Sequence, residues 1–156
     1  MGDQAVGFDA FVSPHLRDMW VLASRLAGPH ARDDVVQEAL LTAWRKLDTF
    51  DPSRGAPRTW LLVIVADKSR KHWRASRPTL ELVDATVPAA DLEAHLDLSR
   101  AVGRLPRRQR IAVELFYVLG LPVVECAAVM GCAVGTVSST LSDARKALRA
   151  TLEVSS

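Results

Sequence analysis

Apolar residues recur at steps of three and four along most of the chain, the spacing that brings side chains onto one face of an α-helix. Short stretches rich in proline, glycine and aspartate interrupt this pattern and mark the turns between helices. The pattern therefore predicts an all-α fold, with helices over about 8–27, 30–47, 58–76, 90–105, 107–119, 122–130 and 135–148.

The segment Leu121–Leu148 carries the clearest pattern. Pro122 stands where a helix begins, a position at which the missing N–H costs no hydrogen bond, and Gly131 stands where that helix ends. A second helix is expected to begin near Gly135–Thr136 after a short turn. Two helices joined in this way form a helix-turn-helix, a DNA-reading element. An ordinary helical hairpin in a bundle core is the alternative. The expected core positions are Val123, Ala127 and Met130 in the first helix, and Val137, Leu141, Ala144 and Leu148 in the second.

The first apolar stripe ends at Gly28-Pro29. Ser13-Pro14 lies inside this stripe and either begins a new helix or kinks the existing one, and the sequence leaves both alternatives open. The residues of this apolar stripe are Phe8, Phe11, Leu16, Met19, Trp20, Ala23 and Leu26.

The helix over 30–47 has a polar face opposite its core face. Its core face comprises Val36, Ala39, Leu40, Ala43 and Leu47, and its opposite face comprises Asp34, Gln37, Glu38, Leu41 and Arg45. A leucine surrounded by charge on an outward face indicates a protein interface, although single exposed leucines are common in proteins that lack one.

A loop over 48–57 precedes a helix whose second half is strongly basic. Basic side chains interleaved with aromatic ones suit single-stranded nucleic acid, because cations follow the phosphates while aromatic rings stack on unpaired bases. A solvated helix end beside buried tryptophans is an equally good interpretation. The residues concerned are Phe50, Trp60, Lys68, Arg70, Lys71, His72, Trp73, Arg74 and Arg77.

Charge divides the chain into three parts. Residues 1–78 hold twelve Lys and Arg against nine Asp and Glu, a balance of +3. Residues 79–97 hold five acids and no base, a balance of −5, and residues 98–156 hold eight bases against four acids, a balance of +4. Two basic lobes suggest two surfaces that each meet a polyanion. We expect domains over 1–77 and 98–156, joined by an acidic linker over 78–97.

The helix over 107–119 is expected to direct Ile111, Leu115 and Val118 inward. Arg107, Arg108 and Arg110 cluster at its start, where cations oppose the helix dipole. Contact with DNA phosphates would explain this cluster, and a solvated surface is the alternative.

Several function classes find no support in the sequence. Cys126 and Cys132 lie six apart without a CxxC or paired histidines, so we expect buried thiols rather than a metal site or a disulfide. The four histidines are scattered, and no glycine-rich phosphate loop or nucleophile–base pair suggests an enzyme. The longest apolar run, 60–66, is too short to span a bilayer, and the first ten residues lack the pattern of a signal peptide. We expect a cytoplasmic protein without membrane insertion, cofactor or metal.

With these residues in view, the chain resembles a sigma factor of the sigma-70 family, in the short two-domain extracytoplasmic function (ECF) group. Four segments carry the resemblance in the family's order, over about 8–149. DDVVQEALLTAW (33–44) is similar to the polymerase-docking helix and RTWL (58–61) to the start of the promoter-melting helix. LPRRQRIAVEL (105–115) and the helix-turn-helix with GTV (135–137) are similar to the domain that reads the −35 element.

The resemblance implies a transcription initiation factor that binds core RNA polymerase through the β′ clamp and β flap, and that binds promoter DNA. Members of the group are often held by an anti-sigma factor. Polymerase binding falls on Asp34, Gln37, Glu38, Leu41 and Arg45. Recognition and melting of the −10 element fall on Phe50, Arg58, Trp60, Lys68, Arg70, Lys71, Trp73 and Arg74. Recognition of the −35 element falls on Arg107, Arg110, Gly135, Thr136, Ser138, Ser139, Ser142, Arg145 and Lys146.

The chain also departs from the family pattern. Members usually carry a basic residue at the position of Ser138 and arginines at those of Thr140 and Asp143. Asp67 stands where asparagine is usual, and Lys71 where aspartate is. Fewer basic residues on the recognition helix should weaken −35 binding and flatten its salt dependence.

Two alternatives to an initiation factor remain. The first is a helix-turn-helix regulator that acts without polymerase docking and binds as a dimer to a symmetric site. The second is a sigma-like interaction protein that docks on polymerase or an antagonist without reading a promoter. The sparse charge of the recognition helix keeps the second alternative open.

Overall fold

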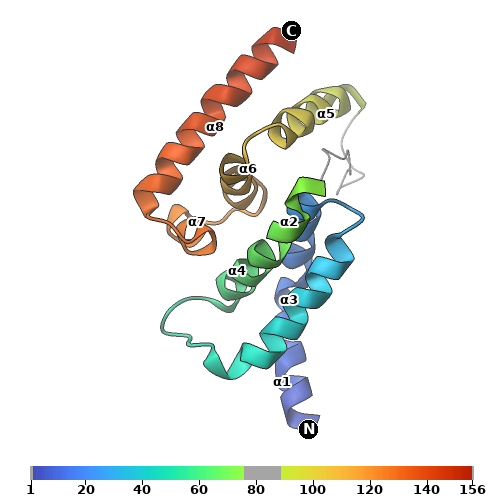
Figure 1. Cartoon of the computed structure of the whole chain (residues 1–156), viewed down its shortest axis with the longest axis vertical. Helices are drawn as coiled ribbons and strands as arrows, with labels where there is room; N and C mark the ends of the chain where they lie inside the picture. Colours follow the sequence, from blue (N-terminus) through green and yellow to red (C-terminus); the bar gives the residue numbers. More distant parts are fainter. Residues whose placement is uncertain (1, 76–88, 156) are drawn as a thin grey trace. The chain divides into compact units, whose positions relative to one another are not determined.

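The chain forms two helical units in the computed structural model (Figure 1), the first over Met1–Ala75 and the second over Ser76–Ser156. The structure describes residues 2–75 and 89–155, with only the backbone described near the ends of these segments and at residue 95. These residues form helices and turns without a strand, which confirms the predicted all-α class.

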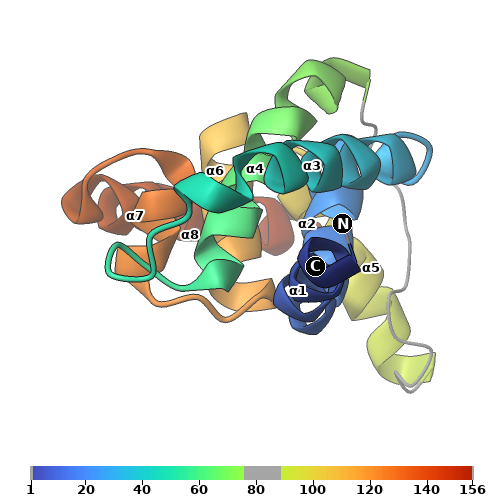
Figure 2. The same cartoon turned by 90° about the horizontal axis from the view of Figure 1, so that it is seen from below.

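The N-terminal unit is built around three helices that pack against one another (Figure 2). Its elements are α1 (Gly2–Val12), η1 (Ser13–His15), α2 (Leu16–Ala27), α3 (Arg32–Lys46), η2 (Leu47–Thr49), α4 (Pro57–Ser69) and η3 (Arg70–Ala75). Its fully buried core is contributed by α2, α3 and α4, and includes Met19, Leu22, Leu26, Val35, Ala39, Leu61, Leu62 and Val65.

Turn chemistry in this unit follows the sequence. Ser13-Pro14, for which both alternatives were open, forms a short 3₁₀ turn between α1 and α2. Gly28 ends α2 at φ 85°, in the left-handed region that glycine tolerates, and its N–H donates to the Ser24 carbonyl at 2.9 Å.

The predicted helix over 58–76 changes character at Ser69. The Ser69 hydroxyl, which is buried, donates to the Val65 carbonyl at 2.8 Å. A serine bonded back to the preceding turn competes with the helical hydrogen-bond ladder and often bends a helix. The chain continues as the 3₁₀ segment η3, which holds much of the predicted basic cluster.

The C-terminal unit has its elements in the order α5 (Ala89–Gly103), α6 (Arg107–Val113), the π-helical turn η4 (Glu114–Val118), α7 (Val123–Met130) and α8 (Val134–Ser155). Helices α5, α6 and α7 each pack against α8. The buried core includes Ala101, Leu105, Ile111, Leu115, Leu121, Cys126, Val137, Leu141 and Ala144.

The linker boundary predicted at residue 97 falls inside α5, which already begins at Ala89. The segment 89–98 holds three alanines, three leucines and one glutamate, all strong helix formers, and these propensities outweigh the acidic charge. The rest of the predicted linker, 78–88, lies outside the described residues.

The core prediction for Val118 is wrong. Val118 is 46% exposed, while its neighbour Leu119 is only 9% exposed. The cause is η4, because a π turn adds one residue to the helical repeat and shifts every later side chain around the axis. Ile111 and Leu115, which precede the end of this turn, are buried as predicted.

No single described helix is long and apolar enough to cross a membrane, and α7 and α8 meet such a criterion only as a pair bent by 97°.

Candidate protein and nucleic-acid interfaces

The outward face of α3 is exposed as the sequence predicts. Asp34, Gln37 and Arg45 are exposed, Glu38 is half-buried, and Leu41 is 55% exposed. Asp33 and Asp34 occupy the first turn of α3, where carboxylates stabilise the helix dipole. A leucine held out among charged side chains gives this face an apolar centre with a polar rim, the layout of a protein interface.

Trp44 lies on the same face and was missed by the sequence analysis. Its side chain is 40% exposed. It lies three residues after Leu41 and seven after Gln37, which places all three on one side of the helix. The ring meets Phe8 of α1 edge to face, with 5.1 Å between ring centroids. Tryptophan contributes strongly to protein interfaces because it buries a large area at little entropic cost.

The basic end of α4 borders a shallow open depression of about 350 Å³ lined by Glu38, Asp67, Lys68, Arg70 and Lys71. Lys71 forms an ion pair with Glu38 of α3, and Arg70 lies 4.0 Å from Asp67. The sequence assigned Glu38 to polymerase and Lys71 to DNA, and the structure brings these two residues into direct contact. The side chains of Trp73 and Arg74 lie outside the described part of the chain.

Arg58, which the resemblance assigns to the −10 element, forms an ion pair with α2. Its Nε donates to Asp18 Oδ2 at 2.6 Å, and both side chains are 28% exposed. Because this ion pair joins the start of α4 to the start of α2, the geometry assigns Arg58 a structural role and does not favour a DNA contact.

Phe50 and Trp60 also pack within the unit. Their ring centroids lie 5.4 Å apart, and Phe11 of α1 lies 5.0 Å from Phe50 and 5.9 Å from Trp60. All three rings meet edge to face, an arrangement favoured by aromatic quadrupoles. Both predicted aromatics are half-buried, so each offers part of its ring to a ligand.

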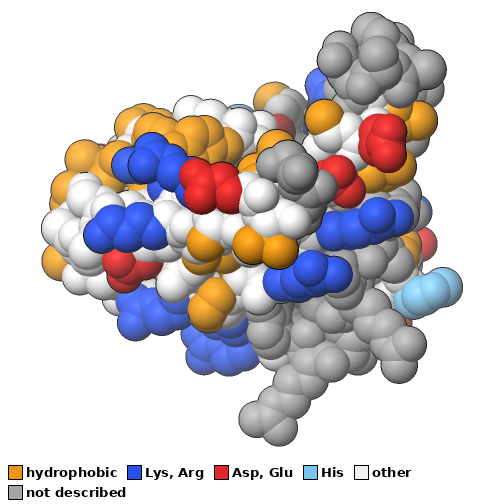
Figure 3. Space-filling view, turned by 90° about the horizontal axis from the view of Figure 1, so that it is seen from above, with side chains coloured by type: hydrophobic (Ala, Val, Ile, Leu, Met, Phe, Trp, Pro, Cys, Tyr) orange, Lys and Arg blue, Asp and Glu red, His pale blue; other side chains and the backbone are white. Residues whose placement is uncertain are grey.

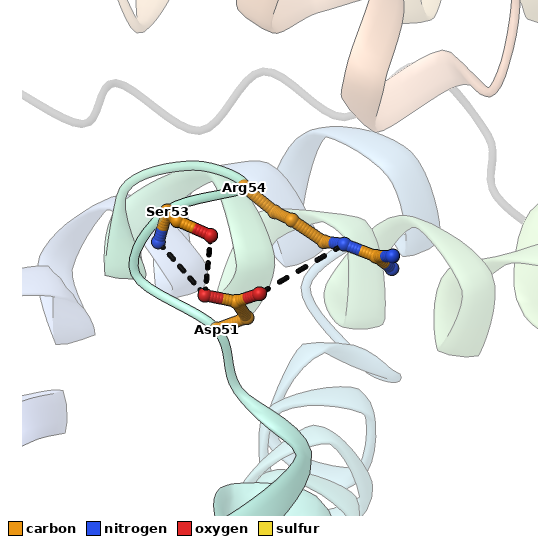
Figure 4. Close-up of polar contacts among 3 residues, drawn as sticks. All are labelled: Asp51, Ser53 and Arg54. Carbon is orange, nitrogen blue, oxygen red and sulfur yellow. Dashed lines mark hydrogen bonds and ion pairs between the residues drawn. The ribbon is translucent and has the colours of Figure 1, made fainter.

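The loop between η2 and α4 has an ordered polar turn (Figure 4). The Ser53 amide and hydroxyl both donate to Asp51 Oδ1, at 2.9 and 2.6 Å, and Arg54 Nε lies 3.9 Å from Asp51 Oδ2. The hydrogen bonds from Ser53 lower the pKa of Asp51 below its ordinary value of 3.8. These contacts order the turn at the start of the exposed loop 51–56.

Helices α7 and α8 form the predicted helix-turn-helix. Gly131 ends α7 in the left-handed conformation, at φ 66°, and the Cys132 N–H donates to the Ala127 carbonyl at 3.1 Å. The two helices meet at 97°, within the range of roughly 90–120° typical of the motif. Ala127 is buried as predicted. Val129 occupies the buried face of α7 that had been assigned to Met130, which is half-buried.

Both cysteines are free thiols, and only Cys126 is buried as predicted. Cys126 is buried and its Sγ donates to the Leu121 carbonyl at 3.5 Å. Burial raises the pKa of the Cys126 thiol to about 11, because a low-dielectric environment disfavours the thiolate. Cys132 is half-buried. Within the described ranges, no cluster of His, Cys, Asp and Glu has the makings of a metal site.

The outward side of α8 presents mainly small hydroxylated residues. Gly135, Thr136, Ser138, Ser139, Arg145 and Lys146 are exposed, and Ser142 is half-buried. Ser139 and Thr140 both donate to the Thr136 carbonyl, at 3.0 and 2.7 Å. Arg145 Nε donates to Tyr117 Oη at 2.7 Å. Figure 3 shows Lys and Arg side chains exposed among hydrophobic and acidic ones on the face seen there.

The arginine cluster of α6 divides between surface and interior. Arg108 is exposed and Arg107 is half-buried, but Arg110 is only 7% exposed. Arg110 lies one helical turn before Glu114, which is 2% exposed. Arg110 fits neither a DNA contact nor a solvated surface, since its guanidinium lies within the unit.

Two family models match the chain, Sigma-70 region 2 over residues 11–79 and Sigma-70 region 4 over residues 95–148. The ECF RNA polymerase sigma factor SigC of Mycobacterium tuberculosis is 34% identical over 155 residues, which cover 93% of this chain and 83% of that protein. The RNA polymerase sigma factor CnrH of Cupriavidus metallidurans is 34% identical over 143 residues, which cover 80% of this chain and 74% of that protein.

Two solved structures are similar in fold. The structure of CnrH in complex with the cytosolic domain of CnrY has a TM-score of 0.74 and 30% identity, covering 99% of this chain and 96% of that chain. The structure of the sigma factor RpoE in complex with the anti-sigma factor NepR from Bartonella quintana has a TM-score of 0.78 and 27% identity, covering 95% of this chain and 98% of that chain. The chain therefore belongs to the sigma-70 family, in its ECF group, and is a transcription initiation factor that binds core RNA polymerase and directs it to specific promoters.

Proposed function

We propose that the two units divide the work of initiation. The N-terminal unit docks on polymerase through the outward face of α3 and holds the melted −10 element against the end of α4, η3 and the loop 51–56. The C-terminal unit reads the −35 element with the first turns of α8. The chain itself catalyses no reaction, since it supplies binding surfaces while polymerase supplies the chemistry, and it acts in the cytoplasm with its polymerase.

The exposed apolar centre of α3 carries this proposal. Leu41 and Trp44 present apolar surface to solvent within a rim that includes Gln37, Glu38 and Arg45. A dimeric helix-turn-helix regulator would use such a face for self-association, so co-elution with polymerase distinguishes the two functions. Asp34, Gln37, Glu38, Leu41, Trp44 and Arg45 are the proposed polymerase contacts.

The proposed −10 contacts are the cations Lys68, Arg70 and Lys71 together with the half-exposed edges of Phe50 and Trp60. Cations can follow the phosphates of the displaced strand, while the aromatic edges and the ordered loop receive unpaired bases. Trp73 and Arg74 stay sequence-based proposals for the same surface.

For the −35 element the proposed contacts are Gly135, Thr136, Ser138, Ser139, Ser142, Arg145 and Lys146 on α8, with Arg107 at the start of α6. Serine and threonine hydroxyls bond to base edges and phosphates alike, whereas arginine and lysine supply the charge. Arg58 and Arg110 are left out of these surfaces because their side chains serve contacts within their own units.

Docking can be tested by co-elution of the full chain with core RNA polymerase. Leu41→Asp places a charge at the centre of the proposed face and should remove the chain from the polymerase fraction. Val63→Asp, at a residue of α4 that is also partly exposed, is the matched control and should co-elute normally. Co-elution of the Leu41→Asp variant at the wild-type level would refute the docking face.

Melting can be tested by permanganate oxidation of unpaired thymines in a promoter bound by the assembled holoenzyme. Lys68→Ala combined with Lys71→Ala should reduce thymine reactivity in the −10 region while polymerase association persists. Undiminished reactivity in that variant would remove these cations from the melting surface.

A regulatory partner is also proposed by similarity. CnrY and NepR are bound to CnrH and RpoE in the two similar structures. We extend this to a protein antagonist for this chain, which would compete with polymerase for the exposed apolar centre of α3.

A further inference from the structure

Tyr117 belongs to none of the surfaces described above, although its hydroxyl forms a hydrogen bond with Arg145, a proposed DNA-binding residue. It is the only tyrosine of the chain, lies in the π turn η4 and is 54% exposed. Its hydroxyl accepts a hydrogen bond of 2.7 Å from Arg145 Nε of α8. An aromatic ring that is half in solvent and bonded to an arginine of the recognition helix has the chemistry of a binding element.

The π turn is what brings Tyr117 to this position. The extra residue of η4 directs Tyr117 and Val118 outward while Leu119 turns inward. The neighbouring ring of Phe116 meets Tyr117 edge to face, with 4.9 Å between centroids. The backbone of η4 therefore sets the position of Tyr117. Single π turns of this kind occur often at functional sites.

With this hydrogen bond formed, Arg145 and Tyr117 still have N–H and O–H donors that can bind an anion. An arginine has five N–H donors in a planar fork, and this bond uses only the one on Nε. The Tyr117 oxygen accepts that proton, so its own O–H proton can be donated to a third group. Together, the two Nη groups and the phenol O–H match the several acceptor oxygens of a phosphate.

The place of Arg145 on α8 favours the DNA backbone over a base. It lies seven residues after Ser138, about two turns or roughly 10 Å further along the same side of the helix. In a helix-turn-helix the first turns of the recognition helix contact base edges, and a residue further along the helix is placed to meet the phosphate backbone.

We propose that Tyr117 and Arg145 form a phosphate-binding pair on the −35 side of the chain, with Tyr117 both positioning the guanidinium and donating to the same phosphate. The proposal rests on the proposed role of α8. It offers one way in which a recognition helix with few cations holds DNA, because an arginine fixed in place beforehand loses less side-chain entropy on binding.

The test uses the full chain and a 30-base-pair duplex of mixed sequence, with affinity measured by fluorescence anisotropy over a range of salt concentrations. Tyr117→Phe removes only the hydroxyl and should weaken binding about five- to tenfold with an unchanged salt slope. Arg145→Ala should weaken binding further and reduce the slope by about one. In the Arg145→Ala background, Tyr117→Phe should have a smaller effect, because only the direct donation from Tyr117 to the phosphate is then lost.

Two control variants separate the effect of the hydrogen bond from the effect of charge, and a third measurement tests folding. Arg145→Lys keeps the charge but lacks Nε, so it should keep the salt slope while reducing the effect of Tyr117→Phe to the loss of its direct donation. Arg149→Ala removes an exposed charge one turn further along α8, without the tyrosine bond, and should change the slope without altering the effect of Tyr117→Phe. Thermal unfolding should be the same for Tyr117→Phe and wild type, because the hydroxyl lies at the surface.

The single tyrosine also supplies a direct signal. Biosynthetic 3-fluorotyrosine gives one ¹⁹F resonance, which should shift on addition of the duplex and should shift much less in Arg145→Ala. Wild-type affinity in Tyr117→Phe, an unchanged ¹⁹F resonance with bound duplex, or no duplex binding by the wild-type chain at low salt would each overturn the pair. Failure to direct transcription would overturn the proposed function without affecting this result.

Discussion

The cations of the two proposed DNA-binding surfaces are held in different ways. At the basic end of α4, Lys71 is paired with Glu38 and Arg70 lies 4.0 Å from Asp67. On the recognition helix α8, Arg145 is instead bonded to the neutral Tyr117. An arginine on a phenol keeps its net charge available to a phosphate, whereas a cation paired with a carboxylate must exchange partners before it binds DNA.

This difference matters most at Glu38 and Lys71. Their ion pair joins the proposed docking face to the proposed melting surface, and both side chains are partly exposed. Exposed ion pairs contribute only about 0–1 kcal/mol, so a basic residue of polymerase that takes up Glu38 can release Lys71 at little cost. The proposed docking face and the proposed melting surface therefore meet at this ion pair.

The largest expected effect, on polymerase binding, comes from reversing the charge of Glu38 in this ion pair. Glu38→Arg should abolish co-elution with core polymerase, because it removes a carboxylate from the docking face and places a cation beside Lys71 and Lys68. The exposed Glu93 of α5 offers the control, and Glu93→Arg should co-elute like wild type. Co-elution of a Glu38→Arg variant that is folded, as judged by circular dichroism, would refute the proposal that α3 docks on polymerase.

The second prediction tests whether the small number of cations on α8 limits its affinity for duplex DNA. Thr140→Arg combined with Asp143→Arg adds two cations and removes one anion, so duplex affinity should rise about tenfold and the salt slope should steepen by up to about two. Val154→Arg adds a cation at an 88% exposed position at the end of α8 and should change either quantity much less. Equal responses in both variants would show that net charge, and not its place on the recognition helix, governs binding.

A smaller effect separates the structural from the functional cations of the N-terminal unit. Arg58→Ala removes a part-buried charged hydrogen bond and should lower the free energy of unfolding by about 1 kcal/mol. Lys71→Ala should lower it by roughly 0–0.5 kcal/mol but weaken binding of single-stranded DNA. All four tryptophans lie in residues 1–75, so urea unfolding followed by tryptophan fluorescence reports this unit alone. The interpretation fails if Lys71→Ala proves the more destabilising change.

The smallest effect concerns the turn at Asp51. The carboxylate is the form that accepts both hydrogen bonds from Ser53, so the pKa of Asp51 is lowered and the turn is stabilised above the ordinary value of 3.8. This stabilisation is lost as pH falls through the lowered pKa. The Ser53 amide resonance should therefore titrate below pH 3.8, and it should not titrate there in Asp51→Asn. A midpoint above the ordinary value would contradict the turn.

Local chemistry in the sequence was enough to predict much of the fold. Gly28 and Gly131 end helices at positive φ because only glycine adopts that backbone without cost. The apolar period of Val137, Leu141 and Ala144 identified the buried face of α8, and the polar surroundings of Leu41 correctly predicted that this leucine is exposed.

The remaining features depend on local backbone irregularity and on tertiary contacts, which the spacing of apolar residues does not predict. The π turn at 114–118 moved burial from Val118 to Leu119, and Arg58 pairs with Asp18 of α2, forty residues earlier in the chain. Arg110 is buried although arginine clusters are usually solvated. Trp44 could have been found, since it lies at helical spacing from Gln37 and Leu41, but tryptophan is assigned to a core by default.

The most direct measurement is run-off transcription on fragmented genomic DNA with core RNA polymerase, with and without this chain, followed by mapping of the RNA 5′ ends. Discrete start sites that require the chain, preceded by shared sequences near −10 and −35, are the expected result. Background starts alone, despite co-elution with polymerase, would contradict promoter recognition by these two units.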